Sequence, residues 1–332
     1  MERRYAMSNI NKISLELEKA KQLEEDIPES VGMLSIKSAN QVINDAISRP
    51  DPTDLWHKLW YEGEVCCLFA DSNLGKSIYA VQIGTHIAEN ERVLYFDFEL
   101  SEKQFQMRYT DESTKEPYHF PDNFYRVEID PEAITTDDFE DAIITDIENA
   151  AQQTKAKVLI IDNLTYLCNS SEKGDKAGSL MIKLMQLKRK YSWSILVLAH
   201  TPKRQNTNAI TQNDLAGSKK LCNFFDSVFA IGKSAKNERL RYIKQIKVRY
   251  GEFTYDSDNI MVCEIKKEDS FLKFVFLEYG TEPEHLKIYT EQEKEELRDM
   301  IISLHNSGKS YRSIASELGC SLSKVQRTLK KK

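Results

Sequence analysis

Long apolar segments are missing from this sequence. No run of about eighteen apolar residues, the length that a membrane-spanning helix needs, occurs in its 332 residues. Its first residues, MERRYAMSNINK, also lack the apolar stretch of a signal peptide. We therefore expect a cytoplasmic protein with no membrane association.

Cysteine pairs of the metal-binding kind are missing as well. The six cysteines include no C-x-x-C pair, and most lie in apolar surroundings. This pattern argues against a zinc site or a disulfide framework and favours buried free thiols. An excess of positive charge is also absent, because 46 Lys and Arg face 52 Asp and Glu, for a net charge of −6. A surface that binds nucleic acid everywhere is therefore not expected, whereas a local basic patch is compatible with this charge.

The composition provides enough apolar residues for a core. Hydrophobic residues make up 41% and aromatic residues 10% of the chain, which argues against bulk disorder. The length exceeds that of an average domain and predicts one large domain with small additions. We expect an N-terminal arm over residues 1–50, in which residues 9–26 form a charged amphipathic helix. This arm would pack either on its own core or on a neighbouring subunit.

Four apolar runs indicate a large domain at residues 51–285. These runs are VCCLFA (65–70), VLYFDFEL (93–100), VLIIDNL (158–164) and SILVLAH (194–200). Runs that are apolar on both faces and alternate with helix-like segments are typical of a parallel sheet covered on both sides. Further strands are predicted at 227–231 and 240–249, and 271–279 is expected to add an antiparallel edge. The predicted fold class is therefore α/β.

Residues 286–332 have a separate, helical pattern. Helices are predicted at about 291–305, at 311–318 and, after a turn that contains Gly319, at 322–330. This outline is that of a helix-turn-helix, so we predict a small all-α C-terminal domain. Seven Lys or Arg accompany a single acidic residue between Lys309 and Lys332. DNA binding is the favoured interpretation of this basic tail, and oligomerisation or packing is the alternative.

The segment ADSNLGKS, from Ala70 to Ser77, matches the phosphate-binding pattern A/G-x4-G-K-S/T. It follows an apolar run and opens a helix, which is the context that the pattern needs. Backbone N–H groups of the loop would bind the phosphates of ATP, Lys76 would contact the β and γ oxygens, and Ser77 would hold Mg²⁺. The predicted nucleotide-binding residues are Ala70, Asp71, Ser72, Asn73, Leu74, Gly75, Lys76, Ser77 and Ile78.

This loop lacks two glycines that are common in such motifs. Ala70 replaces the first, and Asn73 stands where a middle glycine is common. Asn is the non-glycine residue best suited to left-handed backbone, so the loop is still expected to form. An altered affinity for ATP is compatible with both replacements.

Polar side chains end the other predicted parallel strands, where ligands bind in open sheets. Asp162 closes the run VLIID and would hold Mg²⁺ together with Ser77, as a Walker B residue does. Glu99 is assigned as the base that activates water, with Asp97 on the same strand face as a helper. His200 would sense the γ-phosphate through a hydrogen bond. The alternatives are a surface Asp, a carboxylate that caps the next helix and a loop histidine with structural partners.

Together these residues resemble those of the RecA-like ATPases, and among them the hexameric helicases of the DnaB and RepA types. The run ELSEKQFQMR (99–108) is similar to the helicase pattern E-M/L-S-x-x-Q-x-x-x-R, whose Glu is catalytic. DLAGS (214–218) followed by DSV (226–228) resembles the helicase segment D-L-x-x-S…D-x-V. The resemblance covers residues 55–280 and implies a RecA-like P-loop core. Because the sizeable helical N-terminal domain of DnaB proteins is missing, the compact RepA-type plasmid helicases are more similar, although they do not require a C-terminal helix-turn-helix.

The run KVRYG, from Lys247 to Gly251, matches the helicase pattern K-x-R-x-G. In those helicases the segment supplies a Lys and an arginine finger to the ATP of the neighbouring subunit. The resemblance therefore implies catalytic roles for Lys247 and Arg249, with a homo-hexamer as the active form. A cationic, solvated strand end is the alternative.

Contacts with DNA are expected in two places. Segments 169–176 and 202–214 correspond to loops that line the pore and hold single-stranded DNA in RecA-like rings, and Lys203 and Arg204 are the main candidates there. Solvated loops are the alternative. The C-terminal tail resembles the helix-turn-helix of resolvases and transposases. Its candidates for contact with duplex DNA are Ser323, Lys324, Gln326 and Arg327.

Three functions are compatible with these features. The first is an ATP-driven hexameric helicase or translocase that serves replication or mobilisation of a plasmid or transposon. The second is an ATP-switched helix-turn-helix regulator or mobilisation accessory protein that does not unwind DNA. The third is an ATPase whose tail mediates protein contacts only.

Overall fold

Two units make up the chain, which divides after Pro52, close to the boundary predicted at residue 50. The first contains short strands β1 (Ser30–Val31) and β2 (Leu34–Ser35) and helix α2 (Ala39–Ile47), and all its described residues are exposed. The computed structural model describes residues 28–130, 132, 139–167, 174–201, 207–215, 219–286, 291–318, 320 and 322–330.

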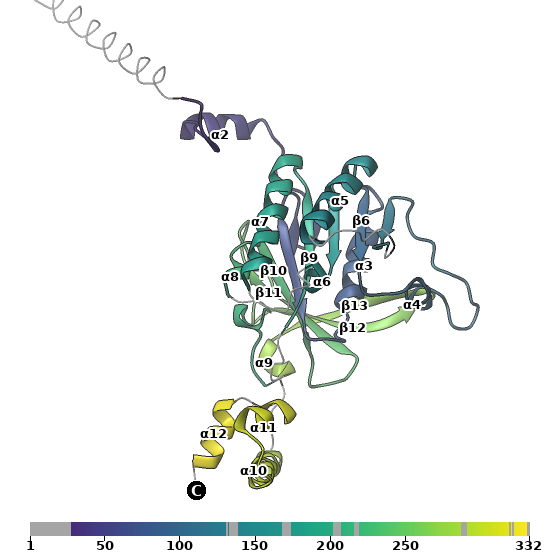
Figure 1. Ribbon diagram of the computed structural model, residues 1–332. Helices are drawn as coiled ribbons and strands as arrows, with labels where there is room; N and C mark the ends of the chain where they lie inside the picture. The colour runs from purple at the N-terminus through teal and green to yellow at the C-terminus, as the bar shows by residue number, and fades with distance from the viewer. Residues whose placement is uncertain are drawn as a thin grey trace, which may run out of the picture. The chain divides into compact units, whose positions relative to one another are not determined.

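A nine-stranded sheet forms the centre of the second unit (Figure 1). In chain order its strands are β5 (Val65–Ala70), β6 (Val93–Asp97), β7 (Phe124–Val127), β8 (Val158–Asp162), β9 (Ser194–His200), β10 (Ser227–Lys233), β11 (Leu240–Lys247), β12 (Ile260–Glu268) and β13 (Phe271–Gly280). In space the order is β13-β12-β11-β10-β5-β9-β8-β6-β7. The strands from β10 to β7 are parallel, whereas β11, β12 and β13 pair in antiparallel fashion. This arrangement confirms the predicted α/β fold with a RecA-like core.

Helices cover both faces of the sheet (Figure 1). Helix α3 (Lys76–Ile87) packs on one face, and α5 (Phe139–Thr154) and α7 (Gly174–Tyr191) pack on the other. In β5 the side chains of Val65, Cys67 and Phe69 join the apolar cluster of α5 and α7, while Cys66, Leu68 and Ala70 join that of α3. Because successive side chains point to opposite faces, a strand covered on both sides is apolar throughout.

Several strands differ from the prediction. Strand β6 ends at Asp97 instead of residue 100, because the Asp97 side chain accepts the N–H groups of Glu99 and Leu100 and the chain turns there. Strand β13 is confirmed as an antiparallel edge. Strands β7 and β12 and the hairpin of β3 (Asp54–Trp56) and β4 (Trp60–Tyr61) were not predicted. Strands β3, β4 and β7 are short or mix polar and apolar residues, and the apolar run of β12 covers only its first four residues before charged ones follow.

Three C-terminal helices form an all-α region, as predicted. They are α10 (Glu291–Asn306), α11 (Tyr311–Glu317) and α12 (Leu322–Lys330). Their own apolar cluster contains Leu297, Ile301, Ile314, Cys320 and Val325. Within the described ranges, no helix is long and apolar enough to cross a membrane.

Candidate active site

The phosphate-binding loop connects the carboxyl end of β5 to the start of α3. Asn73 has φ 63° and Gly75 has φ 94°, so both adopt left-handed backbone, as expected for Asn73. A Cβ atom at Gly75 would lie 2.9 Å from Ile265 Cδ1 and 2.9 Å from the Phe274 ring. Glycine is therefore required at position 75 by conformation and by packing.

The side chain of Lys76 bonds back to the start of this loop. Its Nζ donates hydrogen bonds to the carbonyls of Ala70 at 3.0 Å and Asp71 at 3.3 Å, and it lies 3.1 Å from His200 Nδ1. The side chain is mostly buried, and burial lowers the pKa of its amine. Lys76 and His200, which were predicted to act on the same phosphate, are thus in direct contact.

Asp162 ends β8, where the Walker B carboxylate was predicted. Its side chain is buried and accepts a hydrogen bond of 2.7 Å from the Tyr95 hydroxyl. Burial raises the pKa of the Asp162 carboxyl to about 6, while hydrogen bonds from Ser77 and Tyr95 oppose this rise.

The pair Ser77 and Asp162 fits a magnesium site. The Ser77 hydroxyl, at the start of α3, is close enough to the Asp162 carboxylate, at the end of β8, to lower its pKa, so two hard oxygen ligands are available here. No cluster of three or more His, Cys, Asp or Glu suited to a metal exists among the described residues. None is needed, because Mg²⁺ in such sites takes its other ligands from phosphate oxygens and water.

Glu99, His200 and Asn163 form one polar group between β6, β8 and β9. The Asn163 amide donates to Glu99 Oε1 and lies 3.0 Å from His200 Nε2. Because the Lys76 ammonium can only donate, His200 Nδ1 accepts from it, and Nε2 is the ring nitrogen that faces Asn163 and Glu99. That nitrogen is 3.4 Å from Glu99 Oε1. A continuous chain of contacts therefore connects the loop lysine to the predicted base.

This group keeps Glu99 in its basic form. The hydrogen bond from His200 is the largest cause of a lowered pKa of the Glu99 carboxyl, and the charge of Lys76 acts in the same direction. A carboxylate that stays ionised can accept a proton from water, as the predicted role requires. Sequence reasoning missed Asn163, although its position directly after the apolar run VLIID was a usable signal.

Asp97 does not share a face with Glu99, contrary to the prediction. Glu99 lies in the turn after β6, so the alternation of a strand does not reach it. Asp97 Oδ1 instead accepts the backbone N–H groups of Glu99 at 3.2 Å and Leu100 at 3.0 Å.

The phosphate-binding loop, Glu99 and His200 line a cavity of about 670 Å³. Glu238 and three arginines also line it: Arg108, Arg239 and Arg241. Arg241 Nε donates to the carbonyl of Leu74 in the loop at 3.3 Å. No role was predicted for Arg239 or Arg241, because the motif recognised on this strand lies at its other end, at Lys247.

Lys247 and Arg249 lie near the amino ends of the parallel strands, at the opposite end of the sheet from the phosphate-binding loop. Strand β10 places Ile231 opposite Ala70, at the loop, whereas Lys247 of β11 lies opposite Val228, near the amino end of β5. Lys247 Nζ donates to the carbonyls of Cys222 at 3.0 Å and Phe225 at 2.7 Å. Arg249 Nη1 bonds to Asp226 Oδ1 at 2.7 Å, and its side chain is 54% exposed.

The predicted DNA contacts are only partly described by the structure. Lys203 and Arg204 lie outside the described residues, as does the side chain of Ser323. In α12, Gln326 and Arg327 are exposed and Lys324 is half-buried.

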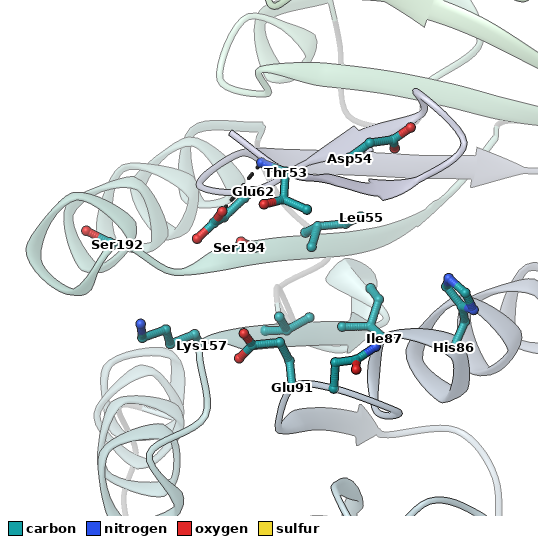
Figure 2. Close-up of a pocket in the computed structure, with 12 residues that line it drawn as sticks. Thr53, Asp54, Leu55, Glu62, His86, Ile87, Glu91, Lys157, Ser192 and Ser194 are labelled. Atoms are coloured by element: carbon teal, nitrogen blue, oxygen red, sulfur yellow. Dashed lines mark hydrogen bonds between the residues drawn. The ribbon is translucent and has the colours of Figure 1, made fainter. Parts of the chain in front are cut away.

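Figure 2 shows a second cavity, of about 330 Å³, at the amino edge of the sheet. It lies between the β3–β4 hairpin, the end of α3 and the starts of β8 and β9. Its lining mixes the acidic side chains of Asp54, Glu62 and Glu91 with Lys157. None of the predicted site residues belongs to it.

Known proteins are similar to this chain in part. A family model described as an AAA domain matches residues 34–206, which is more than half of the chain and includes the loop, Glu99, Asp162 and His200. A solved KaiC-like protein from the hyperthermophilic archaeon Pyrococcus horikoshii OT3 is 14% identical, with a TM-score of 0.48, over 65% of this chain and 91% of that one. A comparison with curated proteins gives no match.

Proposed function

Because this chain belongs to the AAA-domain family, we propose that it hydrolyses ATP to move along DNA as a ring of identical subunits. The observation that carries this proposal is the placement of Lys247 and Arg249. They lie at the edge of the sheet opposite their own phosphate-binding loop, so they are suited to serve the ATP of another copy.

Hydrolysis would use residues that already contact one another. The Glu99 carboxylate would orient the attacking water and accept its proton, and Asn163 would hold that carboxylate in place. Lys76 would stabilise negative charge on the transferred phosphoryl group, with His200 in contact with both Lys76 and Glu99. Mg²⁺, held by Ser77 and Asp162, would supply further charge stabilisation.

The guanidinium of Arg249 from another copy of the chain would complete this site. Arg249 is half exposed and bonded to the buried carboxylate of Asp226, which also accepts the N–H of Val65 and the amine of Lys188. More than half of the Arg249 side chain is exposed despite this ion pair, so its charge is accessible to another molecule at this end of the sheet. Cationic groups supplied by a partner subunit stabilise the transition state of phosphoryl transfer.

Mixing two inactive variants tests the shared site. Lys76→Ala removes the loop lysine but keeps Arg249, and Arg249→Ala does the reverse. In a mixed ring some sites combine an intact loop with an intact arginine, so ATP hydrolysis should return in the mixture. Native mass measurements would establish that mixed rings form. Mixed rings without recovered hydrolysis would refute the shared site.

Movement on DNA is tested by strand displacement from a forked duplex. We expect displacement that requires ATP with the wild type and none with Lys76→Ala. Displacement absent from the wild type, in rings that hydrolyse ATP, would refute helicase activity. Service to plasmid or transposon replication or mobilisation is part of the same proposal and rests on the sequence resemblance.

A second candidate function is an ATP-switched regulator that binds duplex DNA without unwinding it. The separate apolar cluster of α10, α11 and α12 favours it, because those helices have a core of their own. Gel shifts of duplex DNA by the full chain, with Gln326→Ala and Arg327→Ala as variants, test the role of α12. Binding that is lost in the variants, together with absent strand displacement, would favour the regulator over the helicase.

A further inference from the structure

The backbone of the turn that carries Glu99 is held in part by a side chain from the strand before it. It spans residues 98–101 between β6 and α4 (Glu102–Arg108), and the Glu99 side chain is 44% exposed. Two backbone N–H groups of this turn, those of Glu99 and Leu100, donate to Asp97 Oδ1. The direction of the Glu99 side chain therefore depends on the position of the Asp97 carboxylate.

Asp97 is in turn held by an arginine from the neighbouring strand. Its side chain has no exposed surface, and Oδ2 accepts Arg126 Nε at 2.9 Å. Arg126 lies on edge strand β7, where it pairs with Tyr95. Its Nη2 donates to the Leu100 carbonyl at 2.5 Å, and its guanidinium lies 5.0 Å from the centroid of the Phe105 ring in α4. One planar group thus contacts the end of β6, the turn and the helix after it.

We infer that Arg126, acting through Asp97, is a positioning residue that aims the Glu99 carboxylate at the attacking water. This inference rests on the proposed hydrolysis of ATP at the site. A guanidinium offers donors in a rigid fork, so it can hold the carboxylate of Asp97 and the carbonyl of Leu100 in one fixed geometry. Small displacements of a catalytic group are costly, because rate depends steeply on orientation.

The ion pair between Arg126 and Asp97 is not needed to hold β6 and β7 together. Backbone pairing already joins β6 to β7, with Tyr95 opposite Arg126 and Phe96 opposite Val127. Buried ion pairs add little net stability compared with apolar residues of the same volume. Both oxygens of Asp97 are directed to the turn and to Arg126, and Arg126 also pairs with the half-exposed Glu128 at its outer side.

The test compares Arg126→Lys and Arg126→Gln with the wild type in the full-length protein. Lysine keeps the charge but not the fork, and glutamine removes the charge. We expect kcat for ATP hydrolysis to fall about tenfold in Arg126→Lys and further in Arg126→Gln. The Kd and stoichiometry for a fluorescent ADP analogue should stay within about twofold of wild type, since no phosphate contact is lost.

Arg92→Gln is the matched control. Arg92 precedes β6 at its other end and donates to the carbonyl of Thr154 at 2.8 Å, away from the turn, so we expect a wild-type kcat. A purely structural role would lower kcat and ADP stoichiometry together, and that result would overturn the inference. If Arg126→Gln binds no ADP because it does not fold, Arg126→Lys decides alone.

The remaining outcomes separate the inference from the proposed function. Wild-type hydrolysis that Glu99→Gln abolishes, combined with an unchanged kcat in Arg126→Lys and Arg126→Gln, would overturn the inference alone. Equal rates in the wild type and Glu99→Gln would overturn both, because Glu99 would then not be the base.

Discussion

The two edges of the central sheet use their charged side chains differently. At the carboxyl edge, Lys76, His200 and Glu99 contact one another around a cavity. At the amino edge, Asp226 binds Lys188 and Arg249, and the arginine extends into solvent. The charged groups at one end of the sheet surround a cavity, whereas at the other end a half-exposed arginine is held by a buried carboxylate. Under the proposed function, the first would be the ATP site of this chain and the second its contribution to the ATP site of another copy.

The largest effect is expected from the amino edge. Arg249→Ala should lower the rate of ATP hydrolysis by about a thousandfold, the range of an arginine finger. The control is Arg92→Ala, which removes an arginine at the same edge of the sheet that bonds to Thr154 instead of Asp226. Steady-state hydrolysis across a range of protein concentrations measures both. Near-normal hydrolysis by Arg249→Ala would contradict a site completed from outside.

The second largest fall in the rate of ATP hydrolysis is expected when Glu99, at the carboxyl ends of the parallel strands, is replaced. Glu99→Gln keeps the shape of the side chain but cannot accept a proton, so kcat should fall by about a hundredfold or more while ATP binding persists. Glu102→Gln, at the exposed first residue of α4, is the matched control. Single-turnover hydrolysis and nucleotide titration separate the two steps. Loss of binding in Glu99→Gln, instead of loss of rate, would assign Glu99 a different role.

The third prediction concerns stability, which a single methyl group added to the phosphate-binding loop should lower. Gly75→Ala places a Cβ on left-handed backbone and against Ile265 and Phe274, so we expect a loss of stability of about 1–3 kcal/mol. Gly251→Ala has a similar φ of 84° but only Tyr61 Oη at 4.0 Å, and therefore isolates the backbone cost. Thermal unfolding compares the two. Equal Tm values for both variants would show that packing at Gly75 contributes nothing.

The smallest effect is a shift in pH dependence. The hydrogen bond from His200 lowers the pKa of the Glu99 carboxyl, so the carboxylate stays ionised to lower pH. His200→Ala removes that bond, and the pKa of Glu99 should rise. Loss of hydrolysis on acidification should then begin at higher pH than in the wild type. Rate–pH profiles measure this, with His86→Ala, at the other end of α3, as the control whose profile should not move.

Much of the carboxyl edge could be predicted because its motifs are local. The loop pattern from Ala70 to Ser77 lies between a strand and a helix that the alternation of apolar runs already indicates. Asp162 and His200 end such runs, and strand ends in a parallel sheet meet at one edge. The left-handed φ of Asn73 agrees with the prediction that Asn can replace a glycine in this loop.

Other residues of the candidate site could not be predicted, because their contacts depend on which strands are neighbours in the sheet. Arg126 lies on an edge strand that no apolar run marks, yet it contacts Asp97, 29 positions earlier in the chain. Arg241 reaches the loop only because β11 folds back beside β10. Asn163 directly follows a recognisable motif, but its contact with Glu99 requires β6 and β8 to be paired.

By itself the sequence predicted a phosphate-binding loop on an α/β core, followed by three C-terminal helices. Those features arise from interactions among near neighbours in the chain, which leave a periodic or spaced pattern. Only the tertiary structure decided which edge each charged residue occupies. Strand order brings together residues far apart in sequence, and it placed Arg249 at the end of the sheet away from the phosphate-binding loop of its own chain. That separation makes the shared site a testable proposal.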